Sequence, residues 1–562
     1  MSHLEKKIIK GHTYYYIIKK KWDKKKKNSV KVSQICLGSA ESIEGRIINP
    51  KPKKAHARWF GDVFSVYSTM VELGIDKLID DLPFSKKESK ILQLSIINRA
   101  AHPTSKNKMS SWFEKTSLFK IYSLSKKELE SFNYTRLMKK VSDNDIEKVL
   151  ATLLQTLRKL GVDTKDIILD NTNYTTRLQK NVRLNLPQLG KSKDGKTGCL
   201  QINIHMIVTK DGKMPLYYSP YQGNINDPTF FKMNREKLLK LGEEFKTNNK
   251  KVTISIDAGH NSEDNVKAVD SKYNFIGTLR PSMCKDLIEK PSSEFTKTIK
   301  LHDGECIRIY SEKRKVYGKE YTLVVSQFSA TQRKSAYTLD DNTDRIIHNI
   351  KLFEQDLNAT FKAEEEGLKK RKTKFHDINK IKSHVTELIK KKKYVKEILT
   401  PTIRIANNRI SIELKINQRR QEEIKDQLGR AIRFTNRDDF SPEEIVEYYR
   451  GQYMVEHQFR DLKSPYLTSI MPMYHHTDET IKTFIFTNYM ALLILTYMER
   501  KIKTKLKLSI IKDTMLEELR DMTEIMLVFD NKITSIISEK DKQIQEEMYN
   551  LFNLEKYYQL PI

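Results

Sequence analysis

The alternation of hydrophobic and polar positions near the start of the chain favours strands. Residues 13–18 and 30–37 are rich in β-branched and aromatic side chains, and lysines dominate residues 19–27 between them. This pattern predicts a hairpin of two strands with a strongly basic turn. Two roles for the lysines stay open, because they either contact a polyanion or only block pairing at the sheet edge by repulsion.

Helical periodicity dominates the next part of the chain. Residues 86–99 form one predicted helix, Pro103 interrupts the pattern, and residues 104–119 form a second helix. Two helices around a short turn are similar to a helix-turn-helix, although most such pairs are ordinary packing units. A further amphipathic helix is predicted at residues 142–160.

Strand-like runs then return at residues 166–170, 199–208 and 214–221. A Lys-Asp-Gly-Lys turn makes the last two runs a hairpin. Apolar and polar residues alternate from 252 to 257, which places Asp257 at the end of a half-buried strand. These elements predict a mixed sheet accompanied by helices.

The second half of the chain alternates between the helical and the strand-like spacing of hydrophobic residues. Residues 344–399 have helical spacing, with Gly367 as a soft break, and another helix is predicted from Pro442 past Lys463. Four further strand-like runs appear, at residues 306–310, 321–327, 402–416 and 430–435. A charged stretch joins the first two runs, and the last two are predicted to pair.

Length and charge narrow the class of protein. At 562 residues the chain is too long for one hydrophobic core, so about three or four structural units are expected. The 102 Lys and Arg outnumber the 72 Asp and Glu, and the net charge of +30 favours a polyanionic partner such as nucleic acid. An AT-rich coding sequence accounts for part of the lysine excess without any phosphate binding. The four cysteines lie far apart, which argues against a zinc ribbon or a disulfide framework.

Hydropathy argues against a membrane protein. The first ten residues are charged, and no apolar run reaches the ~18 residues that span a bilayer. Residues 484–498 come closest, but Thr487, Asn488 and Thr496 interrupt the run, whose length suits a buried core helix. We expect a cytoplasmic protein without a membrane partner.

Two aspartates follow apolar strands. Asp170 precedes Asn-Thr-Asn-Tyr, and Asp257 precedes Ala-Gly-His, where Gly259 allows a close backbone approach. Carboxylates at strand ends supply the oxygen ligands that Mg²⁺ and Mn²⁺ prefer, and two ions ~3.5–4 Å apart activate the attacking oxygen and stabilise the leaving oxygen. For each aspartate alone, a turn-capping role is the ordinary alternative.

A third acidic segment lies on the predicted C-terminal helix. Counted from Tyr449, the residues Gln452, Glu456 and Lys463 recur at offsets of three, seven and fourteen, which places all four on one helical face. Without the two aspartates, simple exposure to solvent would explain this polar face.

The third segment resembles the signature of the DDE transposases of bacterial insertion sequences, in the insertion-sequence 4 superfamily. Tyr449, Glu456 and Lys463 match its Y-(2)-R-(3)-E-(6)-K pattern, and Gln452 replaces the arginine. The segments at Asp170 and Asp257 look like the first and second acid motifs of that family. The separations are 257 − 170 = 87 and 456 − 257 = 199 residues, and the long second gap resembles members with a β-strand-rich insertion domain. The resemblance covers residues 166–498.

The resemblance implies an α/β protein with an RNase H-like catalytic domain. It implies that Asp170, Asp257 and Glu456 bind Mg²⁺ or Mn²⁺, as two ions. It places Tyr449 and Lys463 against the DNA backbone, and Gln452 and Arg460 are further candidates for DNA contact. Arg450 and Arg460 are nearby substitutes for the missing arginine, although neither lies at the signature offset.

Pattern and resemblance together predict six regions and the partners of the chain. The regions are a basic strand region (1–50), a helical, DNA-binding region (51–160), the first part of the catalytic core (161–270), an insertion of strands and long helices (271–430), the second part of the core (431–510) and a helical tail (511–562). The implied partners are double-stranded DNA, as element ends and as target, and a second copy of the chain in the DNA complex. Bound to DNA, the protein would associate with the bacterial nucleoid.

Two rival functions remain beside a transposase that cleaves DNA and transfers strands. An RNase H-like nuclease or junction resolvase would use the same acids but would not join strands. A DNA-binding regulator, or a decayed copy, would have lost metal binding, although the presence of all three acids argues against decay.

Overall fold

A computed structural model describes residues 2–23, 27–48, 52–179, 184–193, 195–196, 198–246, 251–257, 262–300, 306–368, 375, 377–406, 409–529, 533–538 and 542–561. The chain forms two compact units. Unit 1 comprises Met1–Thr156, Asp461–Met471 and Glu479–Ile562, and unit 2 comprises Leu157–Arg460 and Pro472–Asp478. The six regions expected from the sequence stay a prediction beside this organisation.

Unit 2 contains one ten-stranded mixed sheet. Its strands are β5 (Asp166–Thr175), β6 (Gln188–Leu189), β7 (Leu200–Thr209), β8 (Pro215–Gln222), β9 (Thr253–Ile256), β10 (Asn274–Leu279), β11 (Lys297–Lys300), β12 (Cys306–Val316), β13 (Lys319–Phe328) and β16 (Arg430–Thr435). They are ordered β11-β12-β13-β16-β10-β9-β5-β7-β6, and β8 pairs with β7. The neighbours β5, β9 and β10 are parallel, whereas β7 runs antiparallel to both β5 and β8.

The centre of this sheet is buried because its strands are apolar along most of their length. Every residue of β7 and β9 is buried, as is typical of strands covered on both faces. Helix α16 (Pro442–Arg450) packs on the sheet, where Ile445 and Val446 join Ile276 and Val324 in one hydrophobic cluster. This packing attaches the segment that leads to Glu456 to the sheet that carries the two aspartates.

The predicted strands of unit 2 form, with one pairing corrected. The β7–β8 hairpin is confirmed, and β12 and β13 extend into the charged stretch between them. The expected pairing of 402–416 with 430–435 is wrong. The first run is itself a hairpin, of β14 (Leu399–Ala406) with β15 (Arg409–Ile416), whereas the buried strand β16 pairs with β10 and β13. Both neighbours of β16 are distant from it in sequence, and the local hydrophobic pattern does not identify them.

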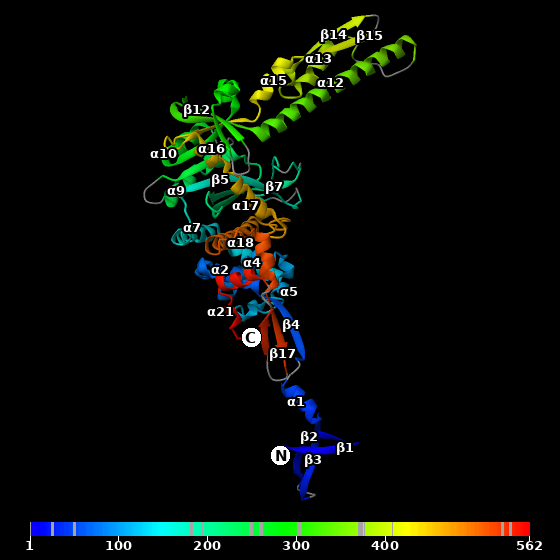
Figure 1. Cartoon of the computed structure of the whole chain (residues 1–562), viewed down its shortest axis with the longest axis vertical. Helices are drawn as coiled ribbons and strands as arrows, with labels where there is room; N and C mark the ends of the chain where they lie inside the picture. Colours follow the sequence, from blue (N-terminus) through cyan, green and yellow to red (C-terminus); the bar gives the residue numbers. More distant parts are fainter. Residues whose placement is uncertain are drawn as a thin grey trace. The chain divides into compact units, whose positions relative to one another are not determined.

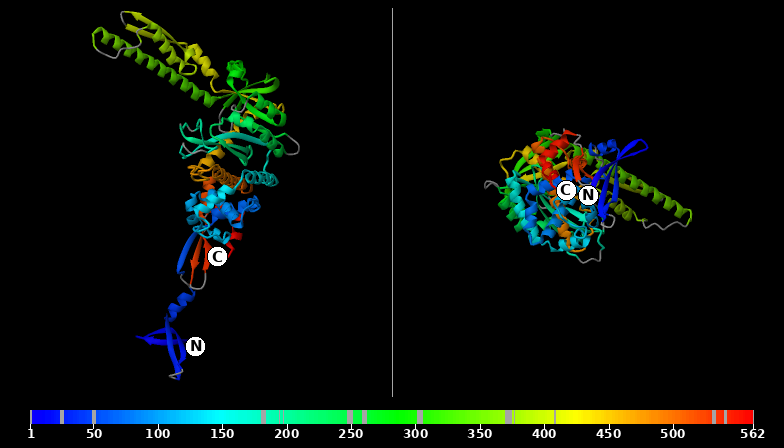
Figure 2. Two further views of the ribbon diagram at one scale, coloured as in Figure 1. Left: turned by 180° about the vertical axis from the view of Figure 1, so that it is seen from behind. Right: turned by 90° about the horizontal axis from the view of Figure 1, so that it is seen from below.

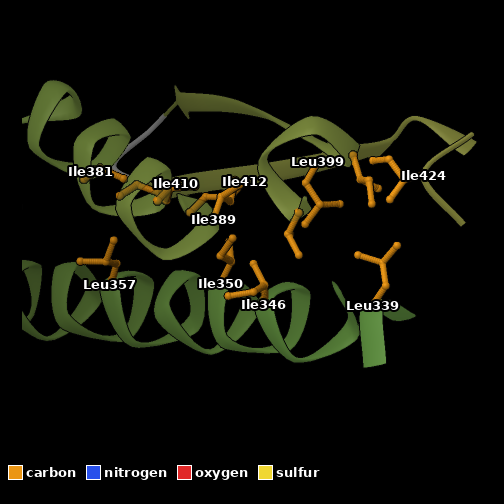
Figure 3. Close-up of a cluster of buried hydrophobic side chains, with 13 residues drawn as sticks. Leu339, Ile346, Ile350, Leu357, Ile381, Ile389, Leu399, Ile410, Ile412 and Ile424 are labelled. Carbon is orange, nitrogen blue, oxygen red and sulfur yellow. The ribbon is translucent and has the colours of Figure 1, made fainter. Parts of the chain in front are cut away.

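Helices and the β14–β15 hairpin build a separate core within unit 2. Helix α12 (Ser329–Glu365) is followed by Gly367, whose φ of +69° suits glycine, and α13 (Ile378–Lys390) begins further on. Figures 1 and 2 show α12 running beside the hairpin. In Figure 3 the apolar side chains of α12 point toward those of α13, β14 and β15. The predicted helical periodicity at 344–399 therefore marks real burial, although its last residue belongs to a strand.

Unit 1 joins helices from both ends of the chain. The helices α2 (Gly61–Glu72) and α4 (Lys86–Ala101) are largely buried, and strand β17 (Thr523–Val528) pairs with β4 (Lys54–Trp59). Among the described residues, only α18 (Asp478–Lys505) is long and apolar enough to cross a membrane by length and composition. In the structure 94% of its most apolar window is buried, so the expected core helix is confirmed.

The predicted N-terminal hairpin forms, but the boundaries of its strands and of the second predicted helix differ from those expected. Strand β2 (His12–Asp23) pairs with β3 (Asn28–Gly38), which confirms the hairpin, but the lysines at 19–21 lie in β2 and not in a turn. Lys24–Lys26 lie outside the described residues. The second helix of the expected helix-turn-helix is wrong, because α5 spans only Met109–Phe113 between two short 3₁₀ turns. A short run of lysines, or a single proline such as Pro103, does not by itself determine where a strand or a helix ends.

Candidate active site

The register of two parallel strands brings Asp170 and Asp257 together. Strand β5 pairs with β9 through Ile168 opposite Ser255, and continuing that register by two residues sets Asp170 opposite Asp257. Neighbouring strands lie about 4.8 Å apart, so the two carboxylates share one edge of the sheet. The expectation that Asp170 ends its strand is wrong, because β5 continues to Thr175 by pairing with β7. It is β9 that ends here, at Ile256, directly before Asp257.

The surroundings of Asp170 disfavour its charged form. Burial raises the pKa of Asp170 to about 7, and the negative charges of Asp257 and Asp227 act in the same direction. The ammonium group of Lys193 opposes these effects and lowers the pKa. The site therefore concentrates carboxylate charge in a partly buried place, which favours a cation.

Lys193 and Asp227 belong to this site although the sequence did not single them out as functional. Lys193 Nζ lies 3.3 Å from Oδ2 of Asp227 and donates to the carbonyl oxygen of Asn171. The Tyr221 hydroxyl donates to Oδ1 of Asp227 over 3.1 Å. The Gly-Asn-Ile-Asn-Asp segment that ends at Asp227 was a signal, since it follows the predicted hairpin directly.

Tyr449 contacts the second aspartate. Its hydroxyl donates to Oδ1 of Asp257 over 3.1 Å, and the Arg433 guanidinium lies 3.8 Å from the centroid of its ring. Burial is the main cause that raises the pKa of Tyr449 to about 12, so the hydroxyl keeps its proton at neutral pH. Arg433 is 8% exposed, and burial lowers its pKa. Its contribution was missed because β16 reaches the site only through non-local pairing.

The continuous helix predicted from Pro442 past Lys463 is wrong. It breaks after α16, and α17 (Tyr453–Lys463) begins beyond Gly451 and Gln452. A Cβ atom at Gly451 would lie 3.0 Å from the carbonyl oxygen of Tyr448 and 3.3 Å from Ile168 Cδ1, so a side chain here would be tightly packed and its neighbours would have to shift by a few tenths of an ångström. Tyr449 and Gln452 therefore lie outside the helix that carries Glu456 and Lys463.

The remaining predicted residues lie along α17 or just before it. Glu456 is in the first turn of α17 and exposed, Arg460 is exposed, and Gln452 and Lys463 are partly buried. Glu456 and Lys463 are seven residues apart, about two turns along one face of the helix. Across the described ranges, no group of three His, Cys, Asp or Glu side chains is close enough to hold a metal ion. The structure thus brings two of the three predicted acids together and leaves Glu456 apart from them.

The donor set at the aspartate pair fits a hard divalent cation. Asp170 and Asp257 offer carboxylate oxygens only, which suits Mg²⁺ or Mn²⁺ better than a softer metal. A bound cation would also offset the repulsion that raises the pKa of Asp170. Gly259 and His260, which follow Asp257, lie outside the described residues.

Comparison with known proteins assigns the chain to a family. Residues 162–494 match the family described as "Transposase DDE domain", which is 494 − 162 + 1 = 333 of 562 residues and includes every predicted site residue. A piggyBac transposase synaptic complex with hairpin DNA is similar at 9% sequence identity, over 78% of this chain and 71% of that chain, with a TM-score of 0.37. No curated protein matches the sequence. The chain belongs to the transposase DDE domain family.

Proposed function

We propose that this transposase cleaves DNA at the ends of an insertion sequence and transfers the strands to a target, with the help of divalent metal ions. The observation that carries the proposal is the aspartate pair, Asp170 opposite Asp257, within a match to the DDE domain. We also propose an RNase H-like fold for the catalytic part of unit 2. A mixed sheet whose central parallel strands carry the first two acids supports it.

Asp170 and Asp257 would hold the metal, with Glu456 as the third ligand. When bound, two such ions activate the attacking oxygen and stabilise the leaving oxygen of a phosphodiester. Neighbouring side chains organise the aspartate site before the metal binds. Tyr449 orients the Asp257 carboxylate through its hydroxyl, and Lys193 supplies a positive charge beside Asp170.

DNA is the proposed partner, and a second copy of the chain is proposed in the DNA complex. The net charge of +30 favours a phosphate backbone, and Gln452, Arg460 and Lys463 are the candidates for contact near the cleaved bond. End recognition is assigned to the N-terminal third, where β2 carries consecutive lysines at 19–21. Arg433 adds a guanidinium beside the ring of Tyr449.

The test of the function is a cleavage assay with the DNA that flanks the coding region. Purified protein is expected to nick DNA that carries its own element's ends when Mg²⁺ or Mn²⁺ is present, and Ca²⁺ should support binding with little cutting. Joining of the cut strand to a second DNA would separate a transposase from a resolvase, which only hydrolyses. Cleavage at an undiminished rate in EDTA would rule out the metal mechanism.

Lys463→Ala should reduce cleavage and joining far more than overall DNA binding. Its ammonium group is expected to pair with a phosphate near the scissile bond, while many other cations share the binding. Lys463→Arg should recover part of the activity. If Lys463 only meets the C-terminal dipole of α17, the Ala variant will cut at the normal rate and lose about 0.3–1 kcal/mol of stability. Cleavage rate and melting temperature, measured on one preparation, decide between the two roles.

A further inference from the structure

Unit 1 contains a pocket of about 410 Å³ that has no part in the proposed chemistry. Strand β4, the end of α4, the turn around Pro103 and α5 contribute to it, so it lies where the sequence suggested a helix-turn-helix. Its volume is in the range of small-molecule sites. The side chains that line it combine aromatic rings with positive charge.

Several contacts support the aromatic wall of the pocket. Trp59 is the last residue of β4, and its backbone N–H donates to the carbonyl oxygen of Lys115 over 2.9 Å. The Trp59 ring stacks on the His102 ring, with centroids 4.1 Å apart and planes 21° apart. His102 Nε2 lies 2.5 Å from Oδ2 of Asp62, a completely buried carboxylate. This support fixes the position of the indole before any ligand arrives.

Three cations surround the aromatic wall. Arg520 Nη2 donates to the carbonyl oxygen of Ala101 over 2.6 Å, and its Nε lies 3.7 Å from Oδ2 of Asp62. The side chains of Lys108 and Lys115 also line the pocket, and Lys115 Nζ lies 5.9 Å from the centroid of the Trp59 ring. None of the lining residues is acidic, because Asp62 lies behind the wall. The pocket therefore suits an anion that carries a flat apolar group.

Tyr466 adds a second aromatic side chain at the pocket. It is 75% exposed, which is unusual for a residue that lines a pocket together with two tryptophans. In sequence it follows Lys463 by three residues, directly after the helix that carries Glu456. An exposed phenol ring can stack on a ligand without any rearrangement of the core.

We propose that this pocket binds an unpaired nucleotide of DNA, with the base against the aromatic rings and the phosphate against the lysines and Arg520. The proposal rests on the proposed function, since that function brings DNA to the protein. Bases stack on aromatic side chains regardless of sequence, and cations hold the adjacent backbone. A base inside an intact duplex is excluded because its faces are already stacked, and an unpaired base is available at the least cost.

The test compares two DNA duplexes of the same sequence, one of which carries a single extra unpaired thymine. The full-length protein should bind the bulged DNA more tightly than the paired DNA, in a titration followed by fluorescence anisotropy. Tyr466→Ala should weaken binding to the bulged DNA by about tenfold and leave binding to the paired DNA unchanged. Tyr337→Ala is the matched control, because Tyr337 is also 75% exposed but lies on α12 in unit 2.

A second measurement locates the base directly. With 5-iodouracil at the unpaired position, irradiation should crosslink the DNA to Trp59 or Tyr466, as read from the modified peptide. Equal affinity for the two DNAs, a preference that survives Tyr466→Ala, or a crosslink outside the pocket would overturn the proposal. So would binding of free thymidine monophosphate without any preference for bulged DNA. If neither DNA is bound, it is the proposed function that fails.

Discussion

Replacement of Asp257 by asparagine is expected to abolish DNA cleavage, with a loss of about a thousandfold or more in rate. A divalent ion at the site supplies several kcal/mol of transition-state stabilisation, and each ~1.4 kcal/mol is a factor of ten in rate. Asparagine keeps the shape of the side chain and still accepts the 3.1 Å hydrogen bond from Tyr449, but it lacks the charge that holds the ion. Asp170→Asn and Glu456→Gln should have the same effect on cleavage.

DNA affinity separates this result from a general loss of structure. All three variants should bind the element's ends about as tightly as the unaltered protein, because lysines and arginines elsewhere supply the phosphate contacts. Asp344→Asn, at an exposed position of α12, is the matched control and should cut normally. Full cleavage by any one of the three variants would remove that residue from the site. This outcome is most informative for Glu456, which lies apart from the aspartate pair.

The pairing of the two aspartates could be predicted only in part. Each acid stands after an apolar run, which identifies a strand and a sheet edge, but the register that sets Asp170 opposite Asp257 depends on hydrogen bonds between segments 87 residues apart. For the same reason the sequence pattern could not mark Arg433 as a residue of the site, since β16 reaches the site by pairing with β10 and β13. Local periodicity reports burial and carries no information about which strand is the neighbour.

The helix break shows a different limit of the sequence pattern. Offsets of three, seven and fourteen residues place Tyr449 and Glu456 on one face only if the helix is continuous. Gly451 was a visible warning, because glycine weakens a helix by about 1 kcal/mol relative to alanine. The break occurs at this glycine, where the backbone lies near the Ile168 side chain of the strand that carries Asp170. A motif can therefore be matched correctly while the geometry inferred from it is wrong.

Asp170→Asn should make the metal-free protein more stable at pH 8, although it inactivates the enzyme. The folded-state pKa of Asp170 is about 7, above the unfolded value of 3.8, so the folded state holds the proton more tightly. Below pH 4 Asp170 is protonated in both the folded and the unfolded state, so it does not lower the free energy of unfolding. As the pH rises from 4 to 7 the unfolded state releases the proton first, and the free energy of unfolding falls. Above pH 7 the full penalty of about 4 kcal/mol is present.

Asparagine removes this penalty, so the stability gained by Asp170→Asn should be near zero at pH 4 and largest above pH 7. Urea unfolding in EDTA at several pH values measures the gain, with Asp344→Asn as the control that should show none. Millimolar Mg²⁺ should cancel the gain, because a cation beside Asp170 stabilises the folded state of the unaltered protein through its carboxylate charge. A variant that is less stable than the unaltered protein at every pH would mean that Asp170 stabilises the fold and is not held there for a cation.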